Sequence, residues 1–211
     1  MNGDLTPDEL RRVLLVYGAS LVPLAAVLAL QLRGKLPRWV AAVYVATFVV
    51  CAVGWEIWFT YGLVEGLPVE ARRSAAMNAA IPQGVNWLLN SLADAGIGLF
   101  GLILVGWAYR GSEAPLRQFR WPAFGILLGW FLAQNLWVEL RLYHTQLAPG
   151  MAISWAPLAP TGPFFNPVLF EVAGRPVHLH TQLPWLLMTP IFYAIARVCF
   201  RRFGAEEVQE A

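Results

Sequence analysis

Long apolar segments, separated by short polar connections, dominate the pattern of this chain. A helix needs about 20 mostly apolar residues to cross the hydrocarbon core of a bilayer, and segments of that kind recur along the whole sequence. We therefore predict an all-α fold, a polytopic transmembrane helical bundle that forms one domain over residues 1–211. The predicted spans cover about 13–32, 39–61, 84–109, 121–143 and 183–200.

The composition supports this prediction. Apolar residues supply 58% of the 211 residues and charged residues only 13%, whereas soluble domains average about 45–50% and about 25%. A net charge of +2 provides no basic field for nucleic acid. We expect an integral membrane protein of a bacterial inner membrane, surrounded by membrane lipids and without a nucleic-acid partner. A homo-oligomer is left open.

The distribution of Lys and Arg predicts the orientation. Nine of the 15 lie on the side that holds the first connection, the third connection and the C-terminus. The side richer in Lys and Arg is usually cytoplasmic, so we predict an outside N-terminus and a cytoplasmic C-terminus. The acidic start, MNGDLTPDELRR, lacks the basic region of a cleavable signal peptide, and we expect none.

The segment 145–182 differs from the spans in its proline content. Too many prolines interrupt it for one continuous helix; they are Pro149, Pro157, Pro160, Pro163, Pro167 and Pro176. Its apolar and aromatic residues disfavour a freely solvated loop. We predict an outer-side lid or re-entrant segment over the outer ends of spans 2 to 4, with a proline-rich surface loop as the alternative.

Ionisable residues inside the spans are the candidates for catalysis. Asn86, Asn90 and Asp94 recur every four residues and so share one helix face. Glu56 lies in the second span and Glu139 in the fourth. Ionisable residues within spans usually face the bundle interior or a cavity, and the 1.5 Å rise per residue places all three acids in the outer half. We predict Glu56, Asp94 and Glu139 as catalytic residues.

These acids also have a structural interpretation. Glu56 could pair with an arginine such as Arg141 and join two helices, and Asn90 could hold Asp94 as a packing device. Arg141 could equally extend to the membrane surface.

Aromatic and polar neighbours of the acids predict the walls of a pocket for a hydrophobic, lipid-like substrate. Aromatic faces suit such a ligand and stabilise a cationic centre, although a tryptophan also fills core positions. The predicted substrate-binding residues are Trp55, Trp58, Phe59, Asn86, Trp87, Asn90, Asn135, Trp137, Tyr143, His178 and His180. On the same side of the third span, Gly98 and Gly101 predict a close helix approach below the pocket.

Other chemistries have little support in the sequence. The HLH run at 178–180 places both imidazoles on one side if it is extended, and a metal bound there with a nearby acid is an open alternative. We predict no metal and no cofactor, and the sequence has no HExxH, Walker or GxSxG motif.

Two segments carry a resemblance to a known family. CAVGWEIWFTYG, at 51–62, and NWLLNSLADAGIG, at 86–98, resemble the small membrane terpene cyclases typified by the fungal meroterpenoid cyclases. The resemblance covers about 40 residues and implies proton-initiated cyclisation of an isoprenoid, with Glu56 as the acid. Those cyclases have about seven spans and an acid in a late span, whereas the fifth span here has none.

A second resemblance is to the emopamil-binding sterol isomerases and the sigma-2-like proteins. The segment YGLVEG, at 61–66, is similar to their His/Glu segment but lacks its histidine. The resemblance implies five spans and buried acids that move a proton on a lipid. We therefore expect a membrane enzyme for acid–base cyclisation or isomerisation of an isoprenoid or lipid-like substrate. A proton-coupled carrier and a non-catalytic assembly subunit are the alternatives.

Overall fold

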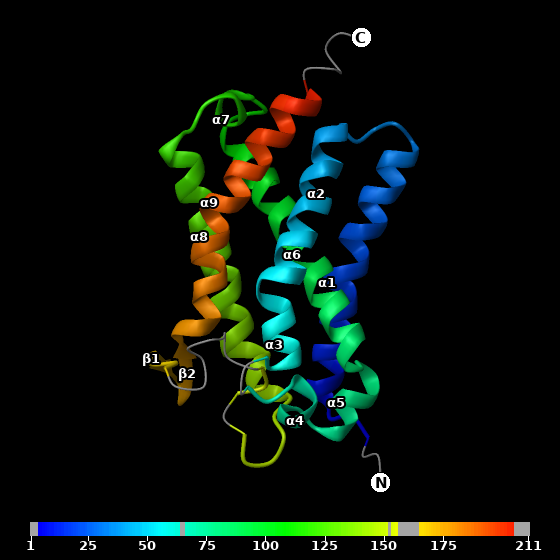
Figure 1. Ribbon diagram of the computed structural model, residues 1–211, viewed down its shortest axis with the longest axis vertical. Helices are drawn as coiled ribbons and strands as arrows, with labels where there is room; N and C mark the ends of the chain where they lie inside the picture. The colour runs from blue at the N-terminus through cyan, green and yellow to red at the C-terminus, as the bar shows by residue number, and fades with distance from the viewer. Residues whose placement is uncertain (1–3, 64–65, 152, 156–164, 205–211) are drawn as a thin grey trace.

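The computed structural model is an upright bundle of long helices (Figure 1), and it describes residues 4–63, 66–151, 153–155 and 165–204. Within these residues five helical segments are long and apolar enough to cross a membrane. They are α1 (Pro7–Leu32), the continuous run of α2 (Arg38–Cys51), η1 (Ala52–Glu56) and α3 (Ile57–Tyr61), α6 (Gln83–Ala108), α8 (Trp121–Arg141) with η2 (Tyr143–Thr145), and α9 (Leu179–Cys199) with η3 (Phe200–Gly204). The predicted all-α transmembrane bundle is confirmed.

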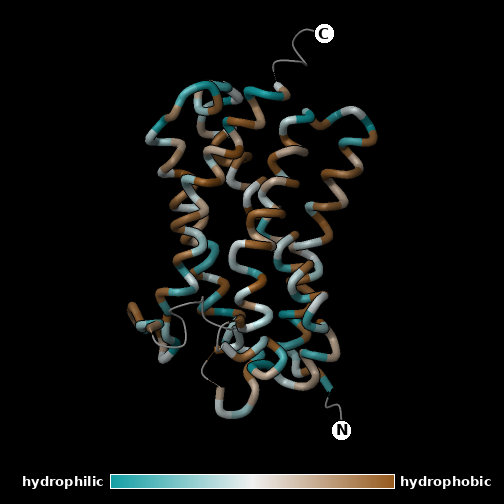
Figure 2. Tube along the Cα trace, in the orientation of Figure 1, coloured by the Kyte–Doolittle hydropathy of each residue, from teal (hydrophilic) through white to brown (hydrophobic). Residues whose placement is uncertain are grey.

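Short elements cap the two ends of the bundle. At the end where α1 begins, here called the Pro7 end, lie α4 (Val69–Arg72), α5 (Ala75–Ala80) and the antiparallel pair β1 (Val168–Val172) and β2 (Arg175–His178) (Figure 1). The opposite end carries α7 (Ala114–Arg117). Figure 2 shows hydrophobic residues along the long helices and hydrophilic residues gathered towards both ends, which is the distribution expected of a protein that crosses a bilayer.

The first helix begins six residues earlier than the sequence predicted. Thr6 and Glu9 form a reciprocal capping box, and Pro7 occupies the first turn. These features satisfy free backbone N–H groups and preset the backbone for a helix. The correction matters because it places Arg12 inside the first span instead of the preceding loop.

The middle helix, α6, packs against α1, α2 and α8, and glycines make the close approach possible. A Cβ atom added at Gly98 would lie 2.6 Å from Phe192 and 3.2 Å from Thr47. At Gly101 it would lie 3.0 Å from Leu127. The predicted close approach below the pocket is therefore present, and it seals the bundle there.

A π-helical turn, η1, interrupts the second span beside the predicted acid. Trp87 of α6 donates its Nε1–H to the carbonyl of Ala52 at 2.9 Å, so a carbonyl at the irregular turn keeps a partner. π-Helical turns are frequent at functional sites. This one ends at Glu56 and fixes where that side chain leaves the helix.

The segment 145–182 combines a loop, a β-hairpin and the start of a helix. Pro157, Pro160 and Pro163 lie outside the described residues. Trp155 packs on Phe59, with 5.1 Å between ring centroids, and lies 6.3 Å from the ring of Tyr143. The described part therefore contacts the Pro7 ends of spans 2 and 4.

The hairpin and the early start of α9 were not predicted. Ala173 and Gly174 take left-handed backbone angles at the turn, with φ of 52° and 74°, as a tight hairpin turn requires. Residues 179–182 belong to α9 instead of the predicted lid.

Candidate functional site

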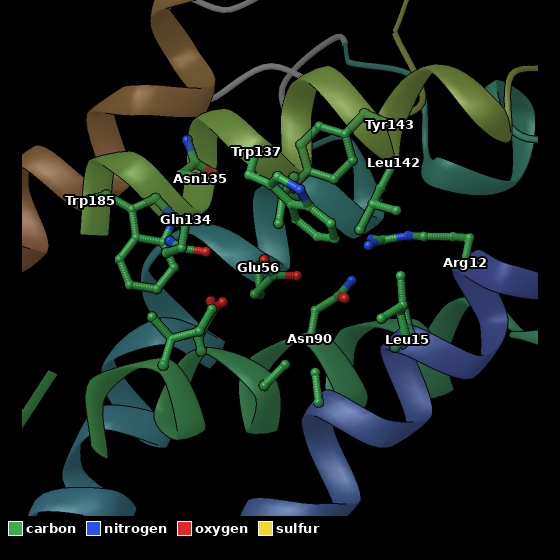
Figure 3. Close-up of a pocket in the computed structure, with 16 residues that line it drawn as sticks. Arg12, Leu15, Glu56, Asn90, Gln134, Asn135, Trp137, Leu142, Tyr143 and Trp185 are labelled. Atoms are coloured by element: carbon green, nitrogen blue, oxygen red, sulfur yellow. The ribbon is translucent and has the colours of Figure 1, made fainter. Parts of the chain in front are cut away.

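A cavity of ≈ 130 Å³ lies in the half of the bundle nearer the Pro7 end, between α1, η1, α6, α8 and α9 (Figure 3). That volume holds about four water molecules at roughly 30 Å³ each. The residues that line it are Arg12, Leu15, Val16, Ala19, Glu56, Asn90, Ala93, Asp94, Ile97, Gln134, Asn135, Trp137, Val138, Leu142, Tyr143 and Trp185.

Glu56 and Asn90 face each other across this cavity (Figure 3). Glu56 is buried, and the Asn90 side chain lies close enough to its carboxyl group to interact with it. An amide can donate to a carboxylate and accept from a carboxylic acid. The pair therefore tolerates both protonation states of Glu56.

Asp94 lies one turn further along α6 and is held from the second span. Trp55 donates its Nε1–H to Asp94 Oδ2 at 2.9 Å, and the Cys51 thiol lies close to the carboxyl group. The charges of Asp94 and Glu56 interact. Two acids from different helices thus share one cavity, each with a polar partner beside it.

Arg12 is the positively charged residue of the cavity lining, and it was not among the predicted site residues. Its side chain reaches from α1 into the cavity (Figure 3) and is 8% exposed, and its Nε atom has no hydrogen-bond partner. The guanidinium carbon lies 5.5 Å from the centre of the Tyr143 ring. In the described part of the chain, no carboxylate lies within 4.0 Å of this guanidinium.

Arg12 is thus an arginine whose positive charge acts on Glu56, across the cavity. Arg141, the partner considered from the sequence, is exposed on α8. The sequence does carry a signal for Arg12. It precedes the buried Val16 and Ser20 by four and eight residues, so it continues the buried stripe of α1 once the helix is extended to Pro7.

Arg73 is a second buried arginine, in the connection between α4 and α5. It donates to Asn86 Oδ1 at 2.9 Å and to the Ile81 carbonyl at 2.8 Å, and Asn86 in turn donates to Thr60 at 3.2 Å. Burial, with a smaller effect of the nearby charge of Arg12, lowers the pKa of Arg73 to about 10. Arg73 therefore stays protonated at neutral pH, and Asn86 is used in this network and not in the cavity wall.

Glu139, the third predicted catalytic acid, does not line the cavity. Its carboxylate accepts from Thr181 Oγ1 at 2.5 Å, from Gln182 Nε2 at 2.7 Å and from the backbone N–H of His178 at 2.9 Å. These donors belong to the first turn of α9 and the residue that precedes it. Glu139 thus caps α9 and fixes it to α8.

The two histidines of the HLH run lie in different surroundings. The ring of His178 lies 3.4 Å from Glu139, whereas His180 is inside the first turn of α9 and its Nδ1 has no partner. The run is not extended, so the geometry assumed for a shared metal is absent. In the part of the chain that the structure describes, no three His, Cys, Asp or Glu side chains group to hold a metal ion.

The remaining predicted residues divide between the cavity and its surroundings. Asn135, Trp137 and Tyr143 line the cavity. Trp55 holds Asp94, and Trp87 holds η1, as described above. Trp58 and Phe59 lie in the same span but outside the cavity lining.

The cavity reaches the lipid-facing surface between α1 and α8. Trp137 of α8 lines it and is 45% exposed, and Ala19 of α1 lines it and is exposed as well. Both residues lie within membrane-spanning helices. The mouth therefore opens sideways, towards the bilayer.

Below the acids the bundle is filled by aromatic rings. Trp185 lies 5.9 Å from Trp55 and 5.1 Å from Phe131, and Phe131 contacts Phe192 at 5.4 Å. Phe131 and Phe192 are fully buried. No described cavity residue continues the polar path towards the opposite end.

A larger apolar groove of ≈ 460 Å³ lies between α1, α2 and α6 on the other half of the bundle. Its lining includes no ionisable side chain. It suits a lipid chain but offers no acid–base chemistry, so the cavity with Glu56 and Asp94 is the candidate site.

Comparisons with protein-family models, with curated proteins and with solved structures found no match. The site must therefore be interpreted from its own chemistry. Two carboxyl groups, one guanidinium and aromatic rings surround a small space that opens to lipid. Such an arrangement can bind a lipid-like molecule and move a proton on it.

Proposed function

We propose that this protein is a membrane enzyme that uses Glu56 and Asp94 as an acid–base pair on an isoprenoid or similar lipid. The observation that carries the proposal is the meeting of these two buried carboxyl groups, from two helices, at one cavity that opens towards the bilayer. The reaction class is proton-initiated cyclisation or double-bond isomerisation, which the resemblance to membrane terpene cyclases and sterol isomerases also favours.

Charge balance supports a proton held between the two acids. With both carboxyls ionised, Arg12 leaves one negative charge unbalanced in the cavity; with one proton on the pair, the cavity is neutral. Unbalanced buried charge is costly. The neutral state therefore has one carboxylic acid ready to donate and one carboxylate ready to accept, and the two titrate as a pair.

The proposed reaction needs no oxidant or reductant. The acid gives its proton to an alkene carbon, or to an epoxide oxygen whose C–O bond then breaks, and a carbocation forms. In a cyclisation a second alkene of the same molecule attacks this cation, which forms a C–C bond and a new carbocation. The carboxylate then removes a proton from a neighbouring carbon, which forms a new double bond and restores the pair in exchanged roles. Trp137 and Trp185 place aromatic faces at the cavity, where they stabilise the cation.

A proton-coupled carrier fits the structure less well. A carrier needs a route from its site to both membrane faces, and the sites of known folds lie at broken helices of internal repeats. Here Phe131, Phe192 and the close approach at Gly98 fill the bundle below the acids. The packing thus favours a site reached from one side.

The excess of Lys and Arg at the end opposite Pro7 supports an orientation with the cavity in the outer half of the membrane. On this basis we propose that the N-terminus lies outside, in a protein of a bacterial inner membrane.

Solvent deuterium provides the test. The purified protein is incubated in D₂O with isoprenoid alcohols, isoprenoid epoxides and a sterol-type olefin, and the products are analysed by mass spectrometry. We expect an olefin to give a product that carries one carbon-bound deuteron from solvent. An epoxide takes its deuteron on an exchangeable hydroxyl, so its product is identified by chromatographic separation from the substrate of equal mass. Glu56→Gln and Asp94→Asn should each lower turnover at least about 100-fold, within the range for loss of general acid–base catalysis, while their melting temperatures stay close to that of the parent.

Glu113→Gln is the matched control, because Glu113 is an exposed acid that pairs only with Arg117. It should keep full turnover. Full activity in Glu56→Gln would exclude Glu56 as the donor. Collapse of both variants in detergent would instead assign the two acids to folding.

A further inference from the structure

The unpaired guanidinium of Arg12 sets this cavity apart from a simple acid–base pocket. A buried polar group normally has a hydrogen-bond partner. Arg12 is more than nine-tenths buried, its Nε atom has none, and its side chain points into the cavity (Figure 3). A group with acceptor atoms would complete it.

No neighbouring acid fills that place. Glu56 lies beside Asn90, and no described carboxylate lies within 4.0 Å of the guanidinium. Glu9, one turn earlier on α1, is used by Thr6 and by Ser74. The cavity therefore lies between the guanidinium and the two acids.

A second cation adds to the positive charge at this end. Arg73 interacts with the charge of Arg12, but its own nitrogens are bound to Asn78, Asn86 and the Ile81 carbonyl. Arg73 can attract an anion without contacting it, whereas Arg12 has donors free to contact one. Guanidinium groups match carboxylate and phosphate oxygens in geometry as well as in charge.

The depth of Arg12 fits a lipid head group. It lies five residues after Pro7, about 7–8 Å into the span at 1.5 Å per residue. Asp94 is eleven residues inside α6 from its start at Gln83, about 16 Å from the same end. Glu56 is five residues from the end of the second span at Tyr61 and so lies at about the same depth as Arg12. A lipid with its head group near the membrane surface and its chain towards the centre thus meets Arg12 and Glu56 before it reaches Asp94.

We infer that Arg12 forms a head-group subsite for an anionic lipid-like substrate, whose carboxylate or phosphate oxygens bind the guanidinium beside Tyr143. The chain of the same molecule passes Glu56 and Asp94 and leaves through the mouth between α1 and α8. This inference rests on the proposed function, since it names the substrate class of the same cavity.

Binding of single-chain probes tests the subsite without the unknown substrate. The protein in nanodiscs is titrated with dodecyl phosphate, dodecanoate and dodecanol, and binding is followed by the fluorescence of the cavity tryptophans and by calorimetry. We expect both anions to bind at least tenfold more tightly than the alcohol. Equal affinities for dodecanol and for the two anions would overturn the inference. This comparison requires no variant.

Matched variants test whether Arg12 causes the preference for the anions over dodecanol. Arg12→Gln should reduce it to less than twofold, and Arg12→Lys should retain part of it. Arg11→Gln, which removes an exposed charge from the adjacent residue of α1, should retain all of it. A preference for anions that survives in Arg12→Gln would overturn the inference. Displacement of dodecyl phosphate by an equal concentration of inorganic phosphate would also overturn it, because the subsite would then bind a free anion.

Glu56→Gln separates this inference from the proposed function. It removes an acid but no anion-binding donor, so it should bind dodecyl phosphate at least as tightly as the parent. Loss of turnover in this variant without any anion preference in the parent would sustain the acid–base pair and reject the subsite. Anion preference with undiminished turnover in Glu56→Gln would sustain the subsite and reject the acid–base pair.

Discussion

Glu56 and Glu139 show how the surroundings of one residue type decide its task. Glu56 faces a cavity and lies beside the Asn90 amide, so its proton can be exchanged with a bound molecule. Glu139 is 1% exposed and accepts from Thr181, Gln182 and the backbone of His178. The carboxylate oxygens of Glu139 are thus already hydrogen-bonded by groups at the start of α9.

We therefore predict that Glu139→Ala acts on stability. Removal of the carboxylate leaves the His178 backbone N–H without its acceptor, whereas Thr181 Oγ1 also donates to the His178 carbonyl and Gln182 Nε2 to Thr181 Oγ1. A buried donor left without a partner costs about 1–3 kcal/mol. The free energy of unfolding should fall by about this amount, read as a lower melting temperature in detergent and as early proteolysis near α9.

Glu113→Ala provides the comparison, since an exposed helical pair contributes about 0.5 kcal/mol or less. A Glu139→Ala protein that melts with the parent but has lost turnover would return this residue to the catalytic group.

The polar pattern of the sequence predicted the acids of the cavity but missed its cation, Arg12. Glu56, Asn90 and Asp94 stand out because a charge or an amide within an apolar run is conspicuous. Arg12 lies next to Arg11 at the start of a span, where arginine is ordinary, and only the capping box at Thr6 shows that it is inside the helix. The role of Glu139 depends on donors about 40 residues away in sequence, which no local pattern reveals.

At the scale of elements, the bundle depends on close contact between α6 and its neighbours. We predict that Gly98→Ala lowers the free energy of unfolding by about 1–3 kcal/mol, the usual cost of overfilling a packed core. The added methyl group would lie 2.6 Å from the Phe192 ring. Thermal unfolding in detergent measures the effect.

Gly106 lies on the same helix with no atom within 4 Å of an added Cβ. Gly106→Ala should leave stability unchanged or raise it by up to about 1 kcal/mol, because alanine is the better helix former. Equal effects of the two substitutions would show that helix propensity, and not packing, governs these sites.

The spans were predictable because their length and apolar content are imposed by the bilayer itself. The hairpin was not. β1 reads VLFEV with every residue exposed, so no alternation of buried and exposed positions marks it. β2 contains a proline, and the surrounding prolines suggested irregular backbone. The π-helical turn at Ala52–Glu56 likewise leaves no mark on hydrophobic periodicity.

For the whole molecule, five spans require the two ends of the chain to lie on opposite sides of the membrane. The start of α1 and the end of α9 do lie at opposite ends of the bundle (Figure 1). In a background with Cys51→Ala and Cys199→Ala, Asp4→Cys should react with a membrane-impermeant maleimide in spheroplasts. Ser112→Cys, in the connection after α6, should react only after lysis.

If Ser112→Cys reacts in spheroplasts and Asp4→Cys only after lysis, the fold stands but the orientation is the opposite of the predicted one. Labelling of both positions in intact spheroplasts would contradict the three spans that lie between them.

The sideways mouth between Trp137 and Ala19 has a kinetic consequence. A substrate that enters through it travels in two dimensions, so the quantity that governs the rate is its mole fraction among lipids and not its molar concentration in the sample. Diluting a fixed amount of enzyme and substrate with inert phospholipid should therefore slow turnover in proportion, whereas diluting the same vesicles with buffer should leave turnover per enzyme unchanged. Comparing the two dilution series in proteoliposomes measures this directly. A rate that follows the volume of buffer would mean that the substrate arrives through water, from the Pro7 end.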